Sequence, residues 1–372
     1  MKRVLSLALA LALCLTLFGC SGQTGSSSSD TASESSVSSQ TEGAASGTES
    51  TSSQEDSSAS SAVSETSEVD AADLGTATVA ALKGPTAMGM VKMMSDDAAK
   101  EEPTFNFNIY ASADEITPKL VQGELDIAAV PANLASVLYN NTEGQVQVLA
   151  INTLGVLYIV EAGDTVHSVA DLKGKTIYAS GKGSTPEYAL NYMLSENGID
   201  PSTDVTIEWK SEHSECVAAL AADATGIAML PQPFVTTAQT QNENLRVALD
   251  MTEEWESLAQ ANGSDVTLIT GVVVARKEFV EQNPDLVKVF LSLYEKSVIY
   301  TQEDVEGAAA LVGQYDIVPE AVAQKALPEC NITFIAGDEM QGKLSAYLQT
   351  LFDQNPKSIG GELPGDDFYY VG

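Results

Sequence analysis

Basic residues are scarce in this chain of 372 residues. Its 18 lysines and arginines stand against 52 aspartates and glutamates, which gives a formal net charge of −34 at pH 7. Because phosphate binding needs clustered Lys and Arg, nucleic acid is excluded as a partner. Arginine is the scarcer base, since only Arg246 and Arg276 follow Arg3. A bidentate arginine clamp on a carboxylate or phosphate is therefore not expected.

Catalytic and metal-binding signatures are also lacking. The sequence has no Gly-x-Ser-x-Gly motif, no P-loop, no His-Glu-x-x-His and no carboxylate spacing that singles out a glycosidase pair. Only His167 and His213 could serve as imidazole bases. His213 and Cys216 could share a helix face, but two ligands do not make a metal site. We therefore expect no enzyme activity, no cofactor and no metal.

No apolar run is long enough to favour a membrane span. The N-terminal run at residues 4–18 follows Lys2 and Arg3, as in a signal peptide, and is too short for a roughly 30 Å hydrocarbon core. It ends Leu17-Phe18-Gly19-Cys20, which resembles the bacterial lipobox. The resemblance implies a signal peptide over 1–19 and a diacylated Cys20 that anchors the protein to the outer face of the cell membrane. The alternative is an ordinary apolar leader that contains a cysteine.

The next segment has almost no large apolar side chains. Twenty serines lie between Ser21 and Ser67, and residues 21–74 carry ten acids and no base. Such a composition cannot offset the entropy of ordering, so we expect a disordered acidic tether over 20–74. The chemistry of the protein is then confined to residues 75–372, which hold only Cys216 and Cys330. Export permits a disulfide between these two, and separate buried thiols are the alternative.

Three landmarks recur in the body at an offset of 99 or 100 residues. Each is a strand-like run followed by a short polar loop or a proline. The pairs are Lys83-Gly84-Pro85-Thr86 with Lys182-Gly183-Ser184-Thr185, Tyr110-Ala111-Ser112 with Trp209-Lys210-Ser211, and Pro131 with Pro231. Their common order predicts two βαβαβ units of one design, although single matches of this kind also arise by coincidence in α/β chains.

Alternating strand and helix patterns predict the α/β class, with a mainly parallel sheet flanked by helices in each of two lobes. Apolar stretches at 146–160 and 266–275 predict the two strands that cross between the lobes. We therefore expect lobe I at 75–161 plus 271–372 and lobe II at 162–270, with a cleft between them.

The repeated loops fall where ligands bind in open α/β sheets, beyond the carboxyl ends of the strands. Gly84 and Gly183 let the backbone approach a ligand, and the helix N-termini that begin near Thr86 and Thr185 could receive an anionic group. The alternative for both threonines is helix capping alone. Glu187 also has two possible roles, which are to stabilise the helix dipole or to contact the ligand. We expect a ligand that is neutral, cationic or singly anionic.

Aromatic and basic side chains near these loops have two readings each. Tyr188, Trp209 and Phe234 could stack on a flat ligand or belong to the core. Lys83 and Lys182 fit solvated charges at the rim better than clamps on the ligand.

With these residues in view, the chain resembles the solute-binding lipoproteins of bacterial ABC importers, in the sulfonate, nitrate and thiamine-pyrimidine group that includes SsuA. The resemblance covers 75–372 and lies in LKGPT at 82–86, GELDIAAVP at 123–131 and VADLKGKTI at 169–177. It implies the two-lobed type II periplasmic-binding fold, a small-molecule ligand, and partners in a permease and, through it, an ATPase. A monomer is expected. The ligand-binding residues expected from the cleft and the resemblance are Gly84, Pro85, Thr86, Ser112, Asn133, Gly183, Ser184, Thr185, Glu187, Tyr188 and Gln232.

Two other functions remain open on the same fold. One is an enzyme, of the thiamine-pyrimidine or menaquinone synthesis type, although those work in the cytoplasm and the cysteine-rich motif of the former is missing. The other is a ligand-sensing domain of a membrane receptor.

Overall fold

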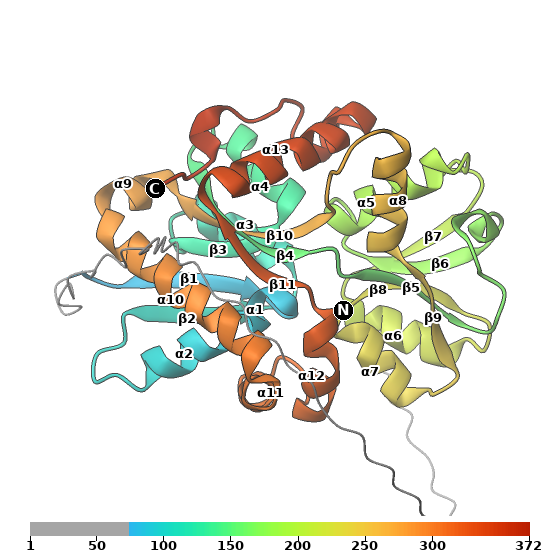
Figure 1. Cartoon of the computed structure of the whole chain (residues 1–372), viewed down its shortest axis with the longest axis horizontal. Helices are drawn as coiled ribbons and strands as arrows, with labels where there is room; N and C mark the ends of the chain where they lie inside the picture. The colour runs from blue at the N-terminus through green and yellow to red at the C-terminus, as the bar shows by residue number, and fades with distance from the viewer. Residues whose placement is uncertain (1–73) are drawn as a thin grey trace, which may run out of the picture. The chain divides into compact units, whose positions relative to one another are not determined.

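A computed structural model describes residues 74–372 of the chain (Figure 1). The expected signal peptide, the lipidated Cys20 and the serine-rich tether to residue 73 lie outside the described residues. Among the helices of the described part, none is both long enough and apolar enough to cross a membrane.

The first lobe is built on a six-stranded sheet with the order β11-β4-β10-β3-β1-β2. Strand β1 pairs in parallel with β2 and β3, whereas β10 is antiparallel to both β3 and β4, and β11 is antiparallel to β4. The strands are β1 (Ala77–Leu82), β2 (Phe105–Tyr110), β3 (Ile127–Pro131), β4 (Val146–Leu154), β10 (Ile269–Arg276) and β11 (Ile332–Ala336).

The second lobe is built on a five-stranded sheet with the order β7-β6-β8-β5-β9. Here β6 pairs in parallel with β7 and β8, and β5 is antiparallel to β8 and β9. The strands are β5 (Leu157–Ala162), β6 (Thr176–Ser180), β7 (Thr206–Lys210), β8 (Ile227–Pro231) and β9 (Leu245–Asp250).

The two sheets repeat one arrangement of strands. In each, the first strand of the unit lies between the second and the third, and one antiparallel strand flanks the third, β10 in the first sheet and β5 in the second. This confirms the predicted α/β class and the repeat. Fewer strands are parallel than the expected mainly parallel sheets would have. Three strands in each sheet are parallel to one another, and the strands next to the crossings run antiparallel to them.

The chain crosses between the sheets twice. Strand β4 leads into β5 through Gly155 and Val156, and the chain returns from β9 through helix α8 (Met251–Ala261) and residues 262–268 to β10. Figure 1 shows both passages between the two groups of strands. The second sheet begins at Leu157, five residues before the predicted start of the second lobe at residue 162.

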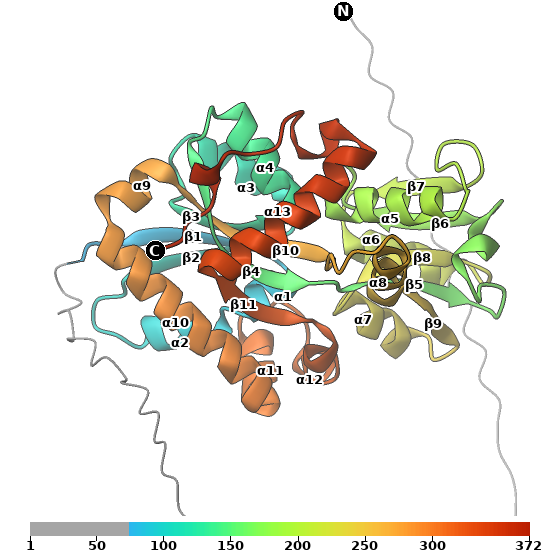
Figure 2. The same ribbon diagram turned by 45° about the horizontal axis from the view of Figure 1, so that its top comes forward.

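Helices cover the faces of both sheets, as the view in Figure 2 shows. The first lobe carries α1 (Pro85–Met88), α2 (Val91–Ala98), α3 (Ala113–Val121), α4 (Ala132–Asn141), α9 (Lys277–Gln282), α10 (Pro284–Glu303), α11 (Val305–Gln314), α12 (Glu320–Ala326) and α13 (Gly337–Gln354). The second carries α5 (Thr185–Glu196), α6 (His213–Ala222), α7 (Phe234–Gln241) and α8.

Two of these helices follow from sequence patterns that are easily recognised. Helix α10 begins at Pro284 after Asn283, as the N-cap and proline pattern predicts, although the Asn283 amide donates to the Phe279 carbonyl instead of capping. Helix α13 carries apolar side chains at helical spacing, and these belong to the core, since Leu344, Tyr347 and Leu348 are fully buried. Burial of an apolar face therefore positions both helices against the core.

The described residues, 74–372, lie in one compact unit, and their largest apolar cluster runs through both lobes. Trp255 of α8 is at its centre. The Trp255 ring lies 4.7 Å from that of Tyr192 on α5 and 5.6 Å from that of Tyr347 on α13, measured between centroids. The Trp255 indole donates to the Val266 carbonyl at 2.9 Å. The lobes therefore share an aromatic junction on the side of α5, α8 and α13.

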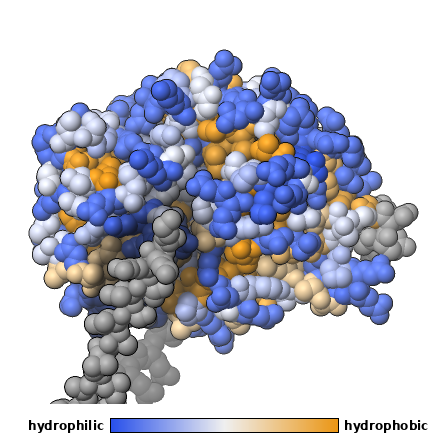
Figure 3. All heavy atoms as spheres, turned by 180° about the vertical axis from the view of Figure 1, so that it is seen from behind, coloured by the Kyte–Doolittle hydropathy of each residue, from blue (hydrophilic) through white to orange (hydrophobic). Residues whose placement is uncertain are grey.

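The face of the molecule drawn in Figure 3 is mainly hydrophilic, with apolar residues in separate patches. The two cysteines of the described part are free and buried, Cys216 in α6 of the second lobe and Cys330 against the first. The disulfide alternative is thus not realised in the structure.

Candidate functional site

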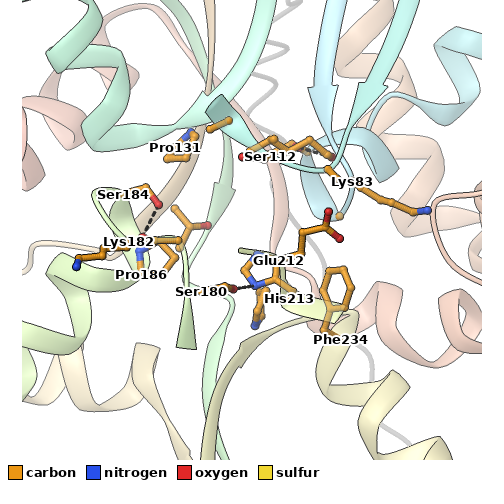
Figure 4. Close-up of a pocket in the computed structure, with 18 of the residues that line it drawn as sticks. Lys83, Ser112, Pro131, Ser180, Lys182, Ser184, Pro186, Glu212, His213 and Phe234 are labelled. Carbon is orange, nitrogen blue, oxygen red and sulfur yellow. Dashed lines mark hydrogen bonds between the residues drawn. The ribbon is translucent and has the colours of Figure 1, made fainter. Parts of the chain in front are cut away.

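A cavity of about 520 Å³ lies between the two lobes (Figure 4). The first lobe lines it with residues 82–86 and 111–114, and the second with 180–184 and 209–213. The first crossing also reaches it at Val156, and strand β10 reaches it at Thr270. These four segments are the loops after the first two strands of each repeated unit, so the repeat brings matching loops face to face.

The loop after β1 exposes backbone to the cavity. Gly84 has φ +146°, a conformation that is essentially restricted to glycine, and no atom lies within 4 Å of the place that a Cβ would take. Thr86 follows it, and its hydroxyl donates to the Leu82 carbonyl at 2.9 Å. The side chain of Thr86 thereby closes the turn while the residue still lines the cavity.

The loop after β2 is held by a capping box. The Ser112 hydroxyl accepts from the Asp114 N–H at 3.2 Å, and the Glu115 carboxylate accepts from the Ser112 N–H at 3.3 Å. This reciprocal pair satisfies two N–H groups at the start of α3. Ser112 lines the cavity, with its hydroxyl engaged in the cap.

The loop after β6 is the counterpart of the β1 loop. Gly183 has φ +78°, and its N–H donates to the Glu187 carboxylate at 2.6 Å. The N-cap of α5 is Ser184 and not Thr185, which corrects the expected cap by one residue. The reason is that the Thr185 hydroxyl turns inward and donates to the Asn133 side-chain oxygen at 3.3 Å.

Ser180 and His213 form a polar pair in the wall of the cavity. The Ser180 hydroxyl lies 2.5 Å from Nδ1 of His213, whose ring is 5.0 Å from that of Phe234. Burial lowers the pKa of His213 to about 4 and raises that of the neighbouring Cys216 thiol to about 11. At neutral pH the pair is thus an uncharged hydrogen-bonding group beside an aromatic ring.

Six of the eleven predicted ligand residues line the cavity. They are Gly84, Pro85, Thr86, Ser112, Gly183 and Ser184. All six come from the loops that the sequence repeat singled out.

The structure does not bring Asn133 and Thr185 to the cavity. Both are fully buried, and they bond to each other across the boundary between the lobes. The Asn133 amide also donates to the Ser358 carbonyl at 2.9 Å and to that of Gly183 at 3.4 Å. Their polar atoms satisfy one another, so they face away from the space open to a ligand.

The other three predicted residues also lie elsewhere. Glu187 is engaged with the Gly183 N–H, in keeping with its helix-terminal role, and Tyr188 packs against the core that both lobes share. Gln232 accepts from the N–H and hydroxyl of Thr236 and lines a separate cavity of about 590 Å³ beside Lys325 of α12. None of these three lines the cavity between residues 82–86 and 180–184.

Several lining residues were not among the predicted ligand contacts. Ser211 and Glu212 occupy the loop after β7, and the 99-residue offset that links Ser112 to Ser211 was a signal that could have found them. Ser180 and His213 gave no such signal, because their pairing joins a strand end to a helix start 33 residues later. Lys83, Lys182, Trp209 and Phe234 all line the cavity, and the two lysines extend outward, as expected of rim charges (Figure 4).

Comparison with known proteins assigns the chain to a protein family. The model of a family described as "ABC transporter, phosphonate, periplasmic substrate-binding protein" matches residues 90–311. A search of curated protein sequences finds no match.

Solved structures of similar fold come from several bacteria. An ABC transporter protein of Parabacteroides distasonis aligns with TM-score 0.66 and 19% identity over 79% of this chain and 98% of that one. The aliphatic sulphonate binding protein SsuA of Escherichia coli aligns with 0.64 and 18% over 79% and 92%. The alkanesulfonate-binding SsuA of Xanthomonas axonopodis, solved with MOPS, aligns with 0.62 and 16% over 80% and 96%. At such identities the likeness establishes a shared fold.

Proposed function

The chain belongs to the periplasmic substrate-binding proteins of ABC transporters, in the family described as phosphonate-binding, and from this premise we propose that it captures its ligand in the cavity between the lobes. The observation that carries the proposal is that equivalent loops, 82–86 and 180–184, meet at one cavity from opposite lobes. A ligand held by both lobes stabilises their approach. The permease then has a closed, loaded form to recognise.

The ligand-contacting residues in this proposal are the six predicted ones that line the cavity, with Trp209 and Phe234 as apolar walls. A volume of about 520 Å³ is within the range of small-molecule sites. We propose that two lobes move on binding. They are the predicted lobes with β5 reassigned from the first to the second, which gives 75–156 plus 271–372 and 157–270.

We propose binding without chemical conversion. Ser180, His213 and Cys216 lie close together, but their environment does not favour nucleophilic catalysis. Burial lowers the pKa of the His213 imidazole and raises that of the Cys216 thiol. An activated thiol needs the opposite shifts. Ser180 and His213 therefore act in this proposal as a neutral hydrogen-bonding group.

We further propose that Cys20 carries the lipid and holds the protein on the outer face of the cell membrane, as a monomer. The support is the lipobox-like Leu17-Phe18-Gly19-Cys20 at the end of an apolar leader. Two acyl chains give stable anchoring, whereas one gives only marginal attachment. The 53 residues between Cys20 and the described body would then tether the binding unit near its permease and ATPase.

A melting-temperature screen tests the proposed function. The chain from residue 20 onward, carrying Cys20→Ala, is unfolded in the presence of each member of a library of small metabolites. A ligand at 100 times its Kd adds about 2.7 kcal/mol to the unfolding free energy, so a true ligand raises the melting temperature measurably. Absence of any stabilising compound, or recovery of the stabilising compound as a reaction product, would contradict the proposal.

A further inference from the structure

The cavity offers no cationic side chain at its centre. Lys83 and Lys182 extend away from the middle of the cavity in opposite directions (Figure 4). Lys210 is paired with Glu208 at 3.1 Å and lies 5.1 Å from the centroid of the Tyr178 ring. The lysines that line the cavity therefore leave its interior without a fixed positive charge.

Arginine does not fill this gap. The body has two arginines, and both are committed to contacts outside the cavity. Arg246 donates to the Glu161 carboxylate and the Gly163 carbonyl, and Arg276 donates to the Asp126 carboxylate at 2.7 Å. An oxyanion in the cavity would find no guanidinium donor.

Backbone N–H groups at three helix starts are also engaged. In each case a glutamate of the first helical turn folds back and accepts from the loop residue before the helix. The pairs are Ser112 N–H with Glu115 at 3.3 Å, Gly183 N–H with Glu187 at 2.6 Å, and Ser211 N–H with Glu215 at 2.8 Å. These N–H groups would otherwise be ready to bind phosphonate or sulfonate oxygens. At these three helix starts the chain's own carboxylates occupy places that an anionic ligand could take.

Two further carboxylates line the cavity from opposite lobes. Asp114 belongs to the first lobe and Glu212 to the second, and within residues 74–372 neither makes a salt bridge with a basic side chain. Figure 4 shows the Glu212 carboxylate turned toward the first-lobe loop that holds Ser112. Glu212 also accepts from the Ser214 hydroxyl at 3.1 Å. Both carboxylates therefore add negative charge to the lining of the cavity.

The walls beside these carboxylates are apolar and partly aromatic. Trp209 and Phe234 line the cavity together with Leu82, Leu157 and Pro231. Aromatic faces stack on flat ligands and attract cations through the ring quadrupole. His213 adds a neutral imidazole to this wall because burial keeps its pKa well below neutrality.

We propose that the cavity binds a flat organic cation between Asp114 and Glu212, and not a phosphonate or sulfonate oxyanion. The inference rests on the proposed function, because it names the ligand class of the same cavity. The negative charge of the whole chain acts in the same direction, since it raises the local concentration of cations and lowers that of dianions.

Four probes that share one phenyl ring test the inference. Benzamidine is the cation, benzamide its neutral counterpart, and benzenesulfonate and phenylphosphonate are the anions. Their dissociation constants are measured by isothermal titration at low and at physiological salt, on the chain from residue 20 onward with Cys20→Ala. We expect benzamidine to bind at least tenfold more tightly than benzamide, and both anions to bind more weakly than benzamide.

Variants assign the effect to the named carboxylates. Glu212→Gln and Asp114→Asn should each weaken benzamidine about fivefold and leave benzamide unchanged. Glu278→Gln, an exposed carboxylate change beside Arg276, is the matched control and should change neither probe. Glu187→Ala, which frees the Gly183 N–H, should strengthen benzenesulfonate.

Each outcome decides the question. Benzamidine no tighter than benzamide, or an anion tighter than both, overturns the inference. If the metabolite screen nevertheless yields a ligand, the proposed function stands while the ligand class fails. If neither the screen nor the four probes gives binding, both fail.

Discussion

Asn133 of the first lobe and Thr185 of the second meet in a fully buried hydrogen bond, with 3.3 Å between the threonine hydroxyl and the asparagine oxygen. The same Asn133 amide reaches the Gly183 carbonyl in the loop that lines the cavity. It also holds the Ser358 carbonyl, and thereby the C-terminal segment that folds back over α4. One side chain thus connects the cavity loop of the second lobe to two elements of the first.

Asn133→Ala should loosen the cavity loop. Removing one partner leaves the Thr185 hydroxyl and the Ser358 carbonyl buried without bonds, which costs about 1–3 kcal/mol of unfolding free energy for each group left unpaired. Hydrogen exchange at the amides of residues 183–185 should speed up at least tenfold. Asn140→Ala is the matched control, because Asn140 donates to the Ile359 and Glu362 carbonyls of the same C-terminal segment without touching the second lobe. Equal exchange at 183–185 in the two variants would show that Asn133 does not position this loop.

His213 should make stability depend on pH. Burial lowers its pKa from 6.5 to about 4 in the folded chain. Between these pH values His213 is protonated in the unfolded chain and neutral in the folded chain. The free energy of unfolding therefore decreases as the pH falls from 6.5 toward 4. His213→Gln should therefore lose less stability than the parent over this range in denaturant titrations. His167→Gln, at an exposed histidine, should behave as the parent does. Parallel curves for His213→Gln and the parent would contradict the burial of a neutral imidazole.

Glu161 should stabilise the second lobe as a charged group. Burial alone raises its pKa, but hydrogen bonds from Val166 and Thr165 and the charge of Arg246 outweigh burial and lower it. Because the folded pKa is depressed, this contribution is present above the unfolded value of 4.5 and is lost as the pH falls through the folded value. Glu161→Gln should cost about 3 kcal/mol at pH 7.

The exposed pair of Arg276 with Glu278 serves as its control. Glu278→Gln should cost under about 1 kcal/mol in urea unfolding at pH 7, since surface pairs contribute little. Equal costs for Glu161→Gln and Glu278→Gln would rule out a stabilising role for the buried carboxylate.

Cys20→Ala should release the protein from membranes, because the thiol that accepts the lipid is gone. The measurement is the partition of the full chain between membrane and soluble fractions in a bacterial host. Cys14→Ala, within the leader, should partition as the parent does. A Cys20→Ala protein that remains as firmly membrane-bound as the parent would place the anchor elsewhere.

The sequence predicted the parts of this fold that depend on local pattern. The repeated Lys-Gly loops and strand ends at a common offset located β1, β2 and β3 and their counterparts β6, β7 and β8, because turn residues and apolar runs are set within a few residues. The antiparallel strands next to the crossings could not be seen in this way, since strand direction depends on partners more than 60 residues away.

The site residues also differ in whether local sequence or contacts between the lobes determine their positions. Gly84, Ser112 and Gly183 line the cavity as expected, since each is fixed by its own turn. Asn133 and Thr185 do not, because their burial results from how the two lobes meet. A helix start that looks open in sequence can also be closed by a glutamate four residues on, as Glu187 does for Gly183.

The central claim is that the ligand binds between the lobes, and a blocked cavity tests it most directly. Ala111 is exposed and lines the cavity, and Ala170 is exposed and lies outside it. The melting temperature of the parent, Ala111→Trp and Ala170→Trp is measured with and without the compound that the metabolite screen selects. We predict that the compound stabilises the parent and Ala170→Trp equally, by about 2.7 kcal/mol at 100 times its Kd, and leaves Ala111→Trp unchanged. Equal stabilisation of all three proteins would contradict the account, because the ligand would then bind outside this cavity.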